Sequence, residues 1–498
     1  MAEMAIDNMT EELKVVASRE HIDLQIRAEQ ILTNLLGWKG GRPYIDARLS
    51  RFPAESNLDW EGGTRDIDGS YINGRKDQAH CVNHLSRVVN KIDQYVLGVS
   101  PIRKDIDENI KQNITIDGQS IDRFMKTVSS LVTVEQWCWI GIDAPSIDPN
   151  AQISLTEKEA MNIRPYWKLY NALEVVDWFY NDLGELEWLI TETMEYQGSD
   201  PFVAPLMVKV RRLWQKGMIT KYTFDPDNQD KIVKVEEIML SYKTRVPFVL
   251  VNETSSEPWG FDSIESINRT LLDLGSCNRQ NFFNSVFCQM YMPASVLDNV
   301  MSKFDCNAES AVTKIMGYSM PILLDTDDVV PGQIMPDASS IGTIRTEIND
   351  LTKELYNSVG LMLQNESRMV ASADAKRFDH LDITQVMKER AQILEDAEKQ
   401  AIKISNEWDS DFKVWEPVYN RDFDVSDFKK DIESLIMTSN VSMPKEMNQY
   451  ILKQIFNRIK QETSVTEEEE QIVLDAIKAF DAGSMELIDI PSFGDNNV

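Results

Sequence analysis

Two long stretches with helical spacing of apolar residues bracket a short proline-containing segment, and this arrangement constrains the fold more than any other feature. Apolar residues three or four positions apart line one face of a helix. The first stretch, 258–287, carries Ile264, Ile267, Leu271 and Leu274. The second, 339–363, carries Ile341, Ile344, Ile348, Leu351, Leu355, Val359 and Met362. The segment 288–338 between them contains prolines, which interrupt helices. We expect two amphipathic helices that bracket a compact insert.

The segments before this unit indicate an α+β protein that is mainly helical. Residues 1–160 are predicted to be mainly helical, with the clearest apolar stripes at 77–97 and 120–140. Residues 165–251 alternate apolar and polar residues between turn signals, which predicts a small antiparallel β unit. The expected strands are Ala172–Tyr180, Leu186–Tyr196, Met207–Gln215, Ile219–Phe224, Val233–Tyr242 and Pro247–Val251.

Within and after the bracketed unit, further elements are predicted from periodicity and capping residues. The insert is expected to hold a short helix near 307–316 and a strand at Met320–Asp325. A polar loop, Gln364–Lys376, should precede a third long helix, Asp382–Asp409. Near the end we expect helices at Phe428–Met437, 442–460 and 466–480, with Thr466 and Glu469 forming a capping box for the last one. The tail Asp481–Val498 is expected to be loosely ordered.

The charge balance bears on possible partners. The chain has 81 acidic and 51 basic residues, a formal net charge of −30. Such an excess opposes tight binding of duplex DNA by phosphate neutralisation, although DNA can still pass near a surface that does not grip it. The simpler interpretation is that acidity provides solubility.

No run of about 18 apolar residues occurs, so we expect no membrane span. The acidic start is unlike a secretory signal, and the five scattered cysteines indicate reduced thiols of a cytosolic protein.

Motifs for catalysis are weak, and we expect a protein that is not an enzyme and holds no cofactor or metal. His80 and His84 have the i, i+4 spacing of a helical metal pair, but Cys81 stands where a metalloprotease has glutamate. The chain contains no P-loop and no GxSxG nucleophile motif. A turn-rich acidic group could hold the divalent metal of a nuclease: Asp325, Asp327 and Asp328.

Several strings and their order resemble those of the portal proteins of tailed bacteriophages. RPYWKLYNALEVVDWFY (164–180) is similar to the start of the β region of the portal wing. The segment 246–298 resembles the passage from that β region into a long helix, followed by a strand at Pro293–Leu297. The helix–loop–helix at 339–409 resembles the second stem helix, the tunnel loop and the long wing helix. The resemblance runs from about 165 to 460 and rests on pattern and order, since the family has no short signature.

The resemblance implies a portal fold. Residues 1–257 and 378–430 would form the wing, 258–287 and 339–363 the paired stem helices, and 288–338 the clip. Residues 364–377 would be the tunnel loop and 431–498 a helical crown with the tail. Arg368, Lys376 and Arg377 would touch DNA. The ring contacts would be made by Ile344, Ile348, Leu351, Leu355 and Val359.

The resemblance also implies partners and a location. The family forms dodecameric rings at one capsid vertex of the virion, assembled in the host cytoplasm, through which double-stranded DNA passes during packaging and ejection. The expected partners are terminase, the head–tail adaptor and the major capsid or scaffold protein, with no membrane. Two alternatives stay open: another virion structural protein, such as an adaptor or scaffold, and a metal-dependent nuclease.

Overall fold

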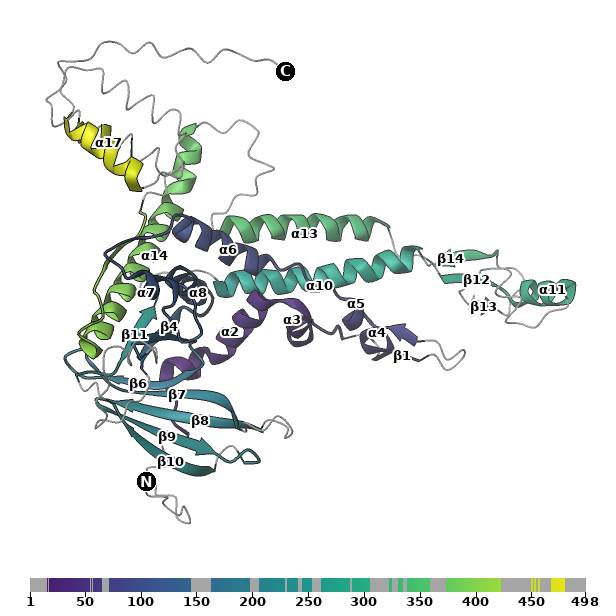
Figure 1. Ribbon diagram of the computed structural model, residues 1–498. Coiled ribbons are helices and arrows are strands. Elements are labelled where there is room, and N and C mark those ends of the chain that lie inside the picture. The colour runs from purple at the N-terminus through teal and green to yellow at the C-terminus, as the bar shows by residue number, and fades with distance from the viewer. Residues whose placement is uncertain are drawn as a thin grey trace, which may run out of the picture. The chain divides into compact units, whose positions relative to one another are not determined.

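The computed structural model divides the chain into two compact units, 1–421 and 422–498. It describes residues 16, 18–53, 55, 57–64, 71–144, 163–197, 206–228, 231–240, 244–252, 261–286, 289–304, 322–324, 330–334, 338–358, 373–421, 449–450, 452–453, 456 and 467–479. The first unit combines helices with small, mostly antiparallel sheets (Figure 1). The α+β class predicted from the sequence is therefore confirmed.

The N-terminal part is a helical layer with short strands. Its three longest helices, α2, α6 and α8, pack against one another. Helix α8 is buried along nearly its whole length because it lies between these helices and a sheet. The bounds are α2 (Ile22–Lys39), α3 (Gly41–Arg48), α4 (Asn57–Glu61), β1 (Gly62–Thr64), β2 (Tyr71–Asn73), α5 (Arg75–Gln78), α6 (His84–Leu97), β3 (Ile102–Lys104), α7 (Glu108–Gln112) and α8 (Ile121–Glu135).

Two predicted helices end or begin at other residues than expected. The single helix predicted over 77–97 is two, because Asn83 accepts a hydrogen bond from the Ser86 N–H at 2.8 Å and starts α6 anew. The helix predicted over 120–140 ends at Glu135, where Gln136 has a φ of +74°. Strand β4 (Trp137–Asp143) follows. Its sequence WCWIGID is an apolar run that periodicity cannot assign to helix or strand. The prediction that one helix runs from 120 to 140 is therefore wrong from Gln136 onward.

Two antiparallel sheets form the β region. The larger has the order β10-β9-β8-β7-β6, and the smaller has the order β11-β4-β5. All six strands predicted between 172 and 251 are present. The bounds are β5 (Tyr166–Tyr170), β6 (Val175–Tyr180), β7 (Leu186–Gln197), β8 (Leu206–Gln215), β9 (Met218–Phe224), β10 (Ile232–Met239) and β11 (Phe248–Asn252).

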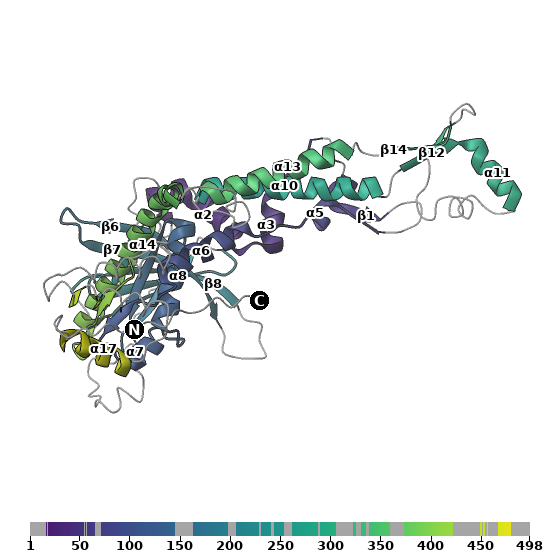
Figure 2. The ribbon, with the colours of Figure 1, turned by 90° about the horizontal axis from the view of Figure 1, so that it is seen from above.

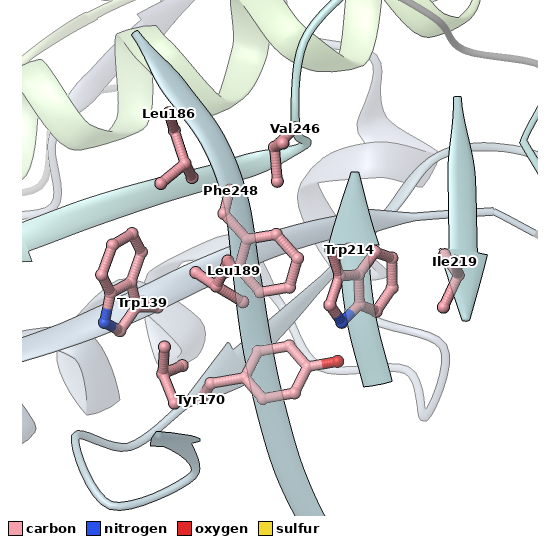
Figure 3. Close-up of a cluster of buried hydrophobic side chains, with 9 residues drawn as sticks. Trp139, Tyr170, Leu186, Leu189, Trp214, Ile219, Val246 and Phe248 are labelled. Carbon is pink, nitrogen blue, oxygen red and sulfur yellow. The ribbon is translucent and has the colours of Figure 1, made fainter. Parts of the chain in front are cut away.

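An aromatic core joins the two sheets. Figure 3 shows Tyr170 and Phe248 of the smaller sheet beside Trp214 of the larger one. The rings of Trp214 and Phe248 meet edge to face at 4.9 Å, a favourable geometry for aromatic pairs. Gly141 lies against the Tyr170 and Phe248 rings, and a Cβ there would be 2.8 Å from the Tyr170 ring. Only glycine fits at that close approach.

A long helix leads out of the β region and a second returns beside it. Helix α10 (Phe261–Val286) passes to strand β12 (Gln289–Pro293) and helix α11 (Ala294–Phe304). Strands β13 (Ile322–Leu324) and β14 (Gly332–Ile334) pair with β12 on either side, and helix α13 (Ala338–Ser358) follows. Helices α10 and α13 lie side by side in both views (Figures 1 and 2). The two predicted helices are confirmed over 261–286 and 339–358.

The insert differs from the prediction in one described place. The strand expected at Pro293–Leu297 ends at Pro293, and Ala294–Leu297 begin α11 instead. Proline lacks an N–H and ends the strand's pairing, while its fixed φ suits the entry to a helix. The helix predicted near 307–316 lies outside the described residues. The strand predicted at Met320–Asp325 is present as β13.

The last long helix of the first unit begins earlier than predicted. Helix α14 (Ala373–Trp408) includes residues 373–377, which were assigned to the tunnel loop. The run Ala373-Asp374-Ala375-Lys376 contains strong helix formers with an acid in the first turn, so the helix extends backwards over it. Strand β15 (Glu416–Val418) then pairs with β3. In the second unit, α17 (Glu467–Ala479) confirms the last predicted helix. The predicted segments 428–437 and 481–498 lie outside the described residues.

Candidate functional site

The candidate site is the pair of helices α10 and α13 together with the insert at their far end. The first half of α10 is held by buried polar contacts as well as by apolar packing. Asp262 in its first turn accepts from Arg27 at 2.9 Å and from the Asn34 amide at 2.8 Å. An acid at this position also meets the positive end of the helix dipole. Helix α10 is thereby fixed to α2, whose sequence lies more than 200 residues earlier.

A buried carboxylate one turn further on connects α10 with α3. Glu265 is 2% exposed and accepts from Arg48 at 3.1 and 3.3 Å. The Tyr44 hydroxyl donates to the same carboxylate at 3.2 Å and accepts from the Asn268 amide at 3.2 Å. Burial raises the pKa of Tyr44, and the Glu265 charge raises it further. Because the Glu265 carboxylate can only accept, the direction of each hydrogen bond from Asn268 through Tyr44 to Glu265 is fixed.

The middle of α10 is held by an arginine sandwich. Arg75 donates to Ser276 at 2.7 Å and to both oxygens of Glu55 at 2.7 and 2.8 Å. Its guanidinium lies 4.5 Å from the Phe52 ring and 4.9 Å from the Trp60 ring. The hydrogen bond from Arg75 is the main cause that lowers the pKa of Glu55. A bidentate pair between two rings is rigid, so α10 has a defined position on the helical layer.

Helix α13 is buried at its end and half-buried along its apolar stripe. Leu355 has no exposed surface and Tyr356 is 8% exposed. The Tyr356 hydroxyl and His84 Nδ1 share a hydrogen bond at 3.1 Å, and their rings meet edge to face at 5.7 Å. Burial is the main cause that lowers the pKa of His84, with Arg87 adding to it. Neutral His84 thus joins the start of α6 to the end of α13.

The predicted ring contacts fall in two environments. Leu355 packs inside the subunit, whereas Ile344, Ile348 and Leu351 are half-buried on α13. Val359 lies outside the described residues. Leu355 therefore has no surface with which to contact another copy. Ile344, Ile348 and Leu351 each keep part of their surface exposed.

A cavity of about 230 Å³ opens where α10, α13 and the segment before α6 meet. Residues from all three and the first residue of α6 line it: His80, Cys81, Val82, His84, Asn268, Leu271, Leu272, Gly275, Arg279 and Ile348. The sequence pointed to His80 and His84 as a helical pair, but only His84 is in α6. Burial raises the pKa of the Cys81 thiol. Among the described residues, no group of three or more histidines, cysteines and acids is placed to hold a metal.

The predicted DNA contacts are only partly placed. Lys376 and Arg377 lie in the first turns of α14, and Arg368 lies outside the described residues. The acidic group Asp325, Asp327 and Asp328 also lies outside them. Within the described part of the chain, no helix is long and apolar enough to cross a membrane.

The polar anchors of α10 escaped the sequence reasoning. The sequence predicted no tertiary contact for Glu265 or Asp273, yet Glu265 is buried and Asp273 accepts from the Ser50 N–H at 2.8 Å. Their spacing along α10 is that of one helix face. No local pattern marks these acids as anchors, because their partners are brought to them only by the tertiary fold.

Comparisons with known proteins give likenesses among solved structures alone. No protein family model matches the chain, and no curated protein matches it. Among solved structures, a chain described as part of the virion of a native gene transfer agent particle is similar to it. The two are 8% identical with a TM-score of 0.39, over 74% of this chain and 89% of that chain. At this score the likeness carries no weight for function, which has to come from the geometry of the chain itself.

Proposed function

We propose that the chain is a portal subunit of a tailed bacteriophage, a structural protein of the virion that forms a ring around a DNA channel at one capsid vertex. The observation that carries the proposal is the out-and-back pair α10 and α13, anchored at one end and bearing a small αβ insert at the other. At 1.5 Å per residue, a helix of 26 residues spans about 39 Å. That length suits the wall of a channel about one turn of duplex DNA long, since a turn of B-DNA rises about 34–36 Å.

The anchoring of α10 supports this assignment. A ring made by repeated heterologous contacts needs each subunit to present the same two surfaces in a fixed relation. The contacts of Asp262, Glu265 and Ser276 hold α10 rigidly on the helical layer. Twelve rigid copies, the number that the resemblance implies, would then close without accumulated error.

The charge of the two helices also fits a channel that does not grip DNA. Helices α10 and α13 carry only four basic residues: Arg269, Arg279, Arg345 and Lys353. Each phosphate neutralised by a basic side chain strengthens binding and slows sliding. A wall with few such residues lets a duplex pass. In this proposal the insert docks terminase and later the head–tail adaptor, and the outer part contacts the capsid or scaffold protein in the host cytoplasm.

Electron microscopy and native mass spectrometry of the purified full chain test the proposal. We expect closed rings of uniform copy number with a central hole wider than about 20 Å, the diameter of a duplex, in keeping with groove dimensions of B-DNA. A chain that stays monomeric at every concentration, or forms open filaments, contradicts the proposal. Incubation with DNA and Mg²⁺ or Mn²⁺ addresses the nuclease alternative, and cleavage that depends on the metal would favour it.

A further inference from the structure

One face of α10 is at the surface of the subunit and carries no charge. Side chains three and four positions apart share a helix face, and here they are Ser263, Ile267, Thr270, Leu274, Cys277 and Asn281. Ser263 and Thr270 are exposed, and the other four are half-buried. A surface helix ordinarily places charged residues on its outward side, and 27% of this chain is charged. The outward side of α10 has none of them in these six positions.

The five charged residues of α10 all lie on its other sides. Asp262, Glu265 and Asp273 accept the hydrogen bonds from the helical layer that are described above. Arg269 donates at 3.3 Å to the hydroxyl of a serine that follows α3, and Arg279 lines the cavity beside α13. The charges of α10 are therefore directed toward its own subunit, and the uncharged face is directed away from it.

Helix α13, which lies beside α10 (Figure 1), has a different surface. Its exposed side chains include charges of both signs: Arg345, Glu347, Asp350 and Glu354. Asp350 also forms an ion pair with Lys353 at 3.8 Å. A duplex that passed along α13 would meet carboxylates, which repel phosphates, and basic groups, which hold them. A duplex that passed along the uncharged face of α10 would meet neither.

The composition of the uncharged face favours DNA over a second protein surface. Its polar groups are hydroxyls, a thiol and an amide. Hydroxyl and amide side chains can contact phosphate oxygens without neutralising their charge, so they release no counterions and add little to affinity. The cores of protein–protein interfaces are instead enriched in aromatic residues, methionine and arginine and depleted in serine. The face has none of the enriched residues, and serine is among its exposed ones.

We propose that the uncharged face of α10 lines the channel and is the surface along which the phosphate backbone of double-stranded DNA slides. The inference rests on the proposed ring, and it assigns α10 to the inner side of the channel wall and α13 to the outer side. From Ser263 to Asn281 the face is about 27 Å long, at 1.5 Å per residue. Over that length the wall neither repels a duplex with acids nor holds it with bases.

A lysine placed on each helix tests the proposal. Thr270 and Thr346 are both exposed, and each hydroxyl donates to the carbonyl four residues earlier at 3.1 Å, so Thr346→Lys is the matched control for Thr270→Lys. Purified rings are mixed with linear duplex DNA or with covalently closed circular DNA of the same length, which cannot thread a closed ring. We expect Thr270→Lys rings to retain linear DNA about tenfold or more better than wild type near 50 mM salt, with the gain lost near 200 mM. Circular DNA should show no gain, and Thr346→Lys rings should stay within about threefold of wild type on linear DNA.

The possible failures have separate meanings. An equal gain for the two variants on linear DNA, or no gain for Thr270→Lys, would overturn the assignment of α10 while the ring itself would stand. Thr270→Lys subunits that are folded by circular dichroism but form no rings would mean that the face contacts another copy, which also overturns it. In a reconstruction of wild-type rings, Thr270 should lie nearer to the ring axis than Thr346, and the opposite order would contradict the inference. Absence of rings in the wild type would instead contradict the proposed function.

Discussion

Arg103 on β3 and Glu398 on α14 form a buried, two-pronged ion pair across almost 300 positions of sequence. The guanidinium donates to the two carboxylate oxygens at 2.7 and 3.0 Å, and the two side chains are 4% and 0% exposed. Trp415 and Tyr419 also donate to Glu398, at 2.9 and 2.7 Å. Glu398 thus has a full set of donors, and it ties the long helix to the β3–β15 pair.

Breaking this pair should destabilise the first unit severely. Arg103→Met leaves a buried carboxylate without its cation, which typically costs about 3–5 kcal/mol. We expect a lower urea midpoint by circular dichroism. The double variant Arg103→Met with Glu398→Leu removes both charges and should recover part of the loss, although Trp415 and Tyr419 lose their acceptor. A double variant no more stable than Arg103→Met would contradict this account of the pair.

How much of the fold the sequence predicts depends on which physical signal each element carries. The strands between 172 and 251 alternate apolar and polar residues because one face is buried, and all six were predicted. Strand β4 is buried on both faces, so its apolar run lacked that alternation and was joined to α8. The later start of α6, at His84 and not at Asp77, was hidden for a different reason: the Asn83 cap interrupts a stripe that looks continuous.

The candidate site was predicted in outline but not in its contacts. Apolar periodicity predicted helices α10 and α13, and the predicted bounds lie within a few residues of the observed ones. The long-range partners of Glu265, Arg75 and Asn268 carry no local pattern, because they are brought together only by the tertiary fold. The cavity is likewise invisible in sequence, although Gly275 within a helical stripe was an available hint.

The stability of the chain should depend on pH through Glu135. Burial, followed by the charge of Glu174, raises the pKa of Glu135 to about 8 from an ordinary value of 4.5. The folded state therefore holds a proton between about pH 4.5 and 8 that the unfolded chain releases, and the free energy of unfolding falls as pH rises through this window. The slope is at most about 1.4 kcal/mol per pH unit.

Glu135→Gln should remove that contribution. Glutamine is neutral at every pH and can still accept from the Ala172 N–H, which lies 2.6 Å from the Glu135 carboxylate. We expect the variant to match wild type near pH 5 and to exceed it in urea unfolding at pH 8. A constant difference between the two proteins from pH 5 to 8 would mean that Glu135 does not titrate in this range.

Introducing an aspartate at two positions of α13 should distinguish residues that pack inside the subunit from residues that contact the next copy in the ring. Leu355 is fully buried, so Leu355→Asp places an unpaired charge in the subunit core and should lower its unfolding free energy by several kcal/mol, in line with about 3–5 kcal/mol for comparable sites. Ile348 is half-buried at the cavity, so Ile348→Asp should leave subunit stability nearly unchanged while preventing rings. Thermal unfolding and mass photometry of both variants check this, and a stable Leu355→Asp subunit would contradict the packing of α13.

The tunnel-loop assignment makes a separate prediction about DNA. Because α14 begins at Ala373, a deletion confined to 365–372 spares that helix while removing most of the predicted loop, including Arg368. We expect rings to form normally and packaging or retention of DNA to fall in a particle assembled with the variant. Deletion of residues 182–183, in the exposed turn of the β6–β7 hairpin, is the control for shortening a loop elsewhere in the chain. Packaging equal to wild type would contradict the loop's role.

A glycine in α13 provides a prediction about helix stability alone. Gly342 is exposed, has no positive φ, and a Cβ there would meet nothing within 4 Å. Gly342→Ala should therefore raise the free energy of unfolding by about 0.5–1 kcal/mol, because alanine reduces the freedom of the unfolded chain and is accepted by the helix without strain. Urea unfolding measures this gain. Gly141→Ala is the opposite case, since its Cβ would be 2.8 Å from the Tyr170 ring, and it should destabilise the chain. A loss of stability on Gly342→Ala would mean that α13 is not helical at this position.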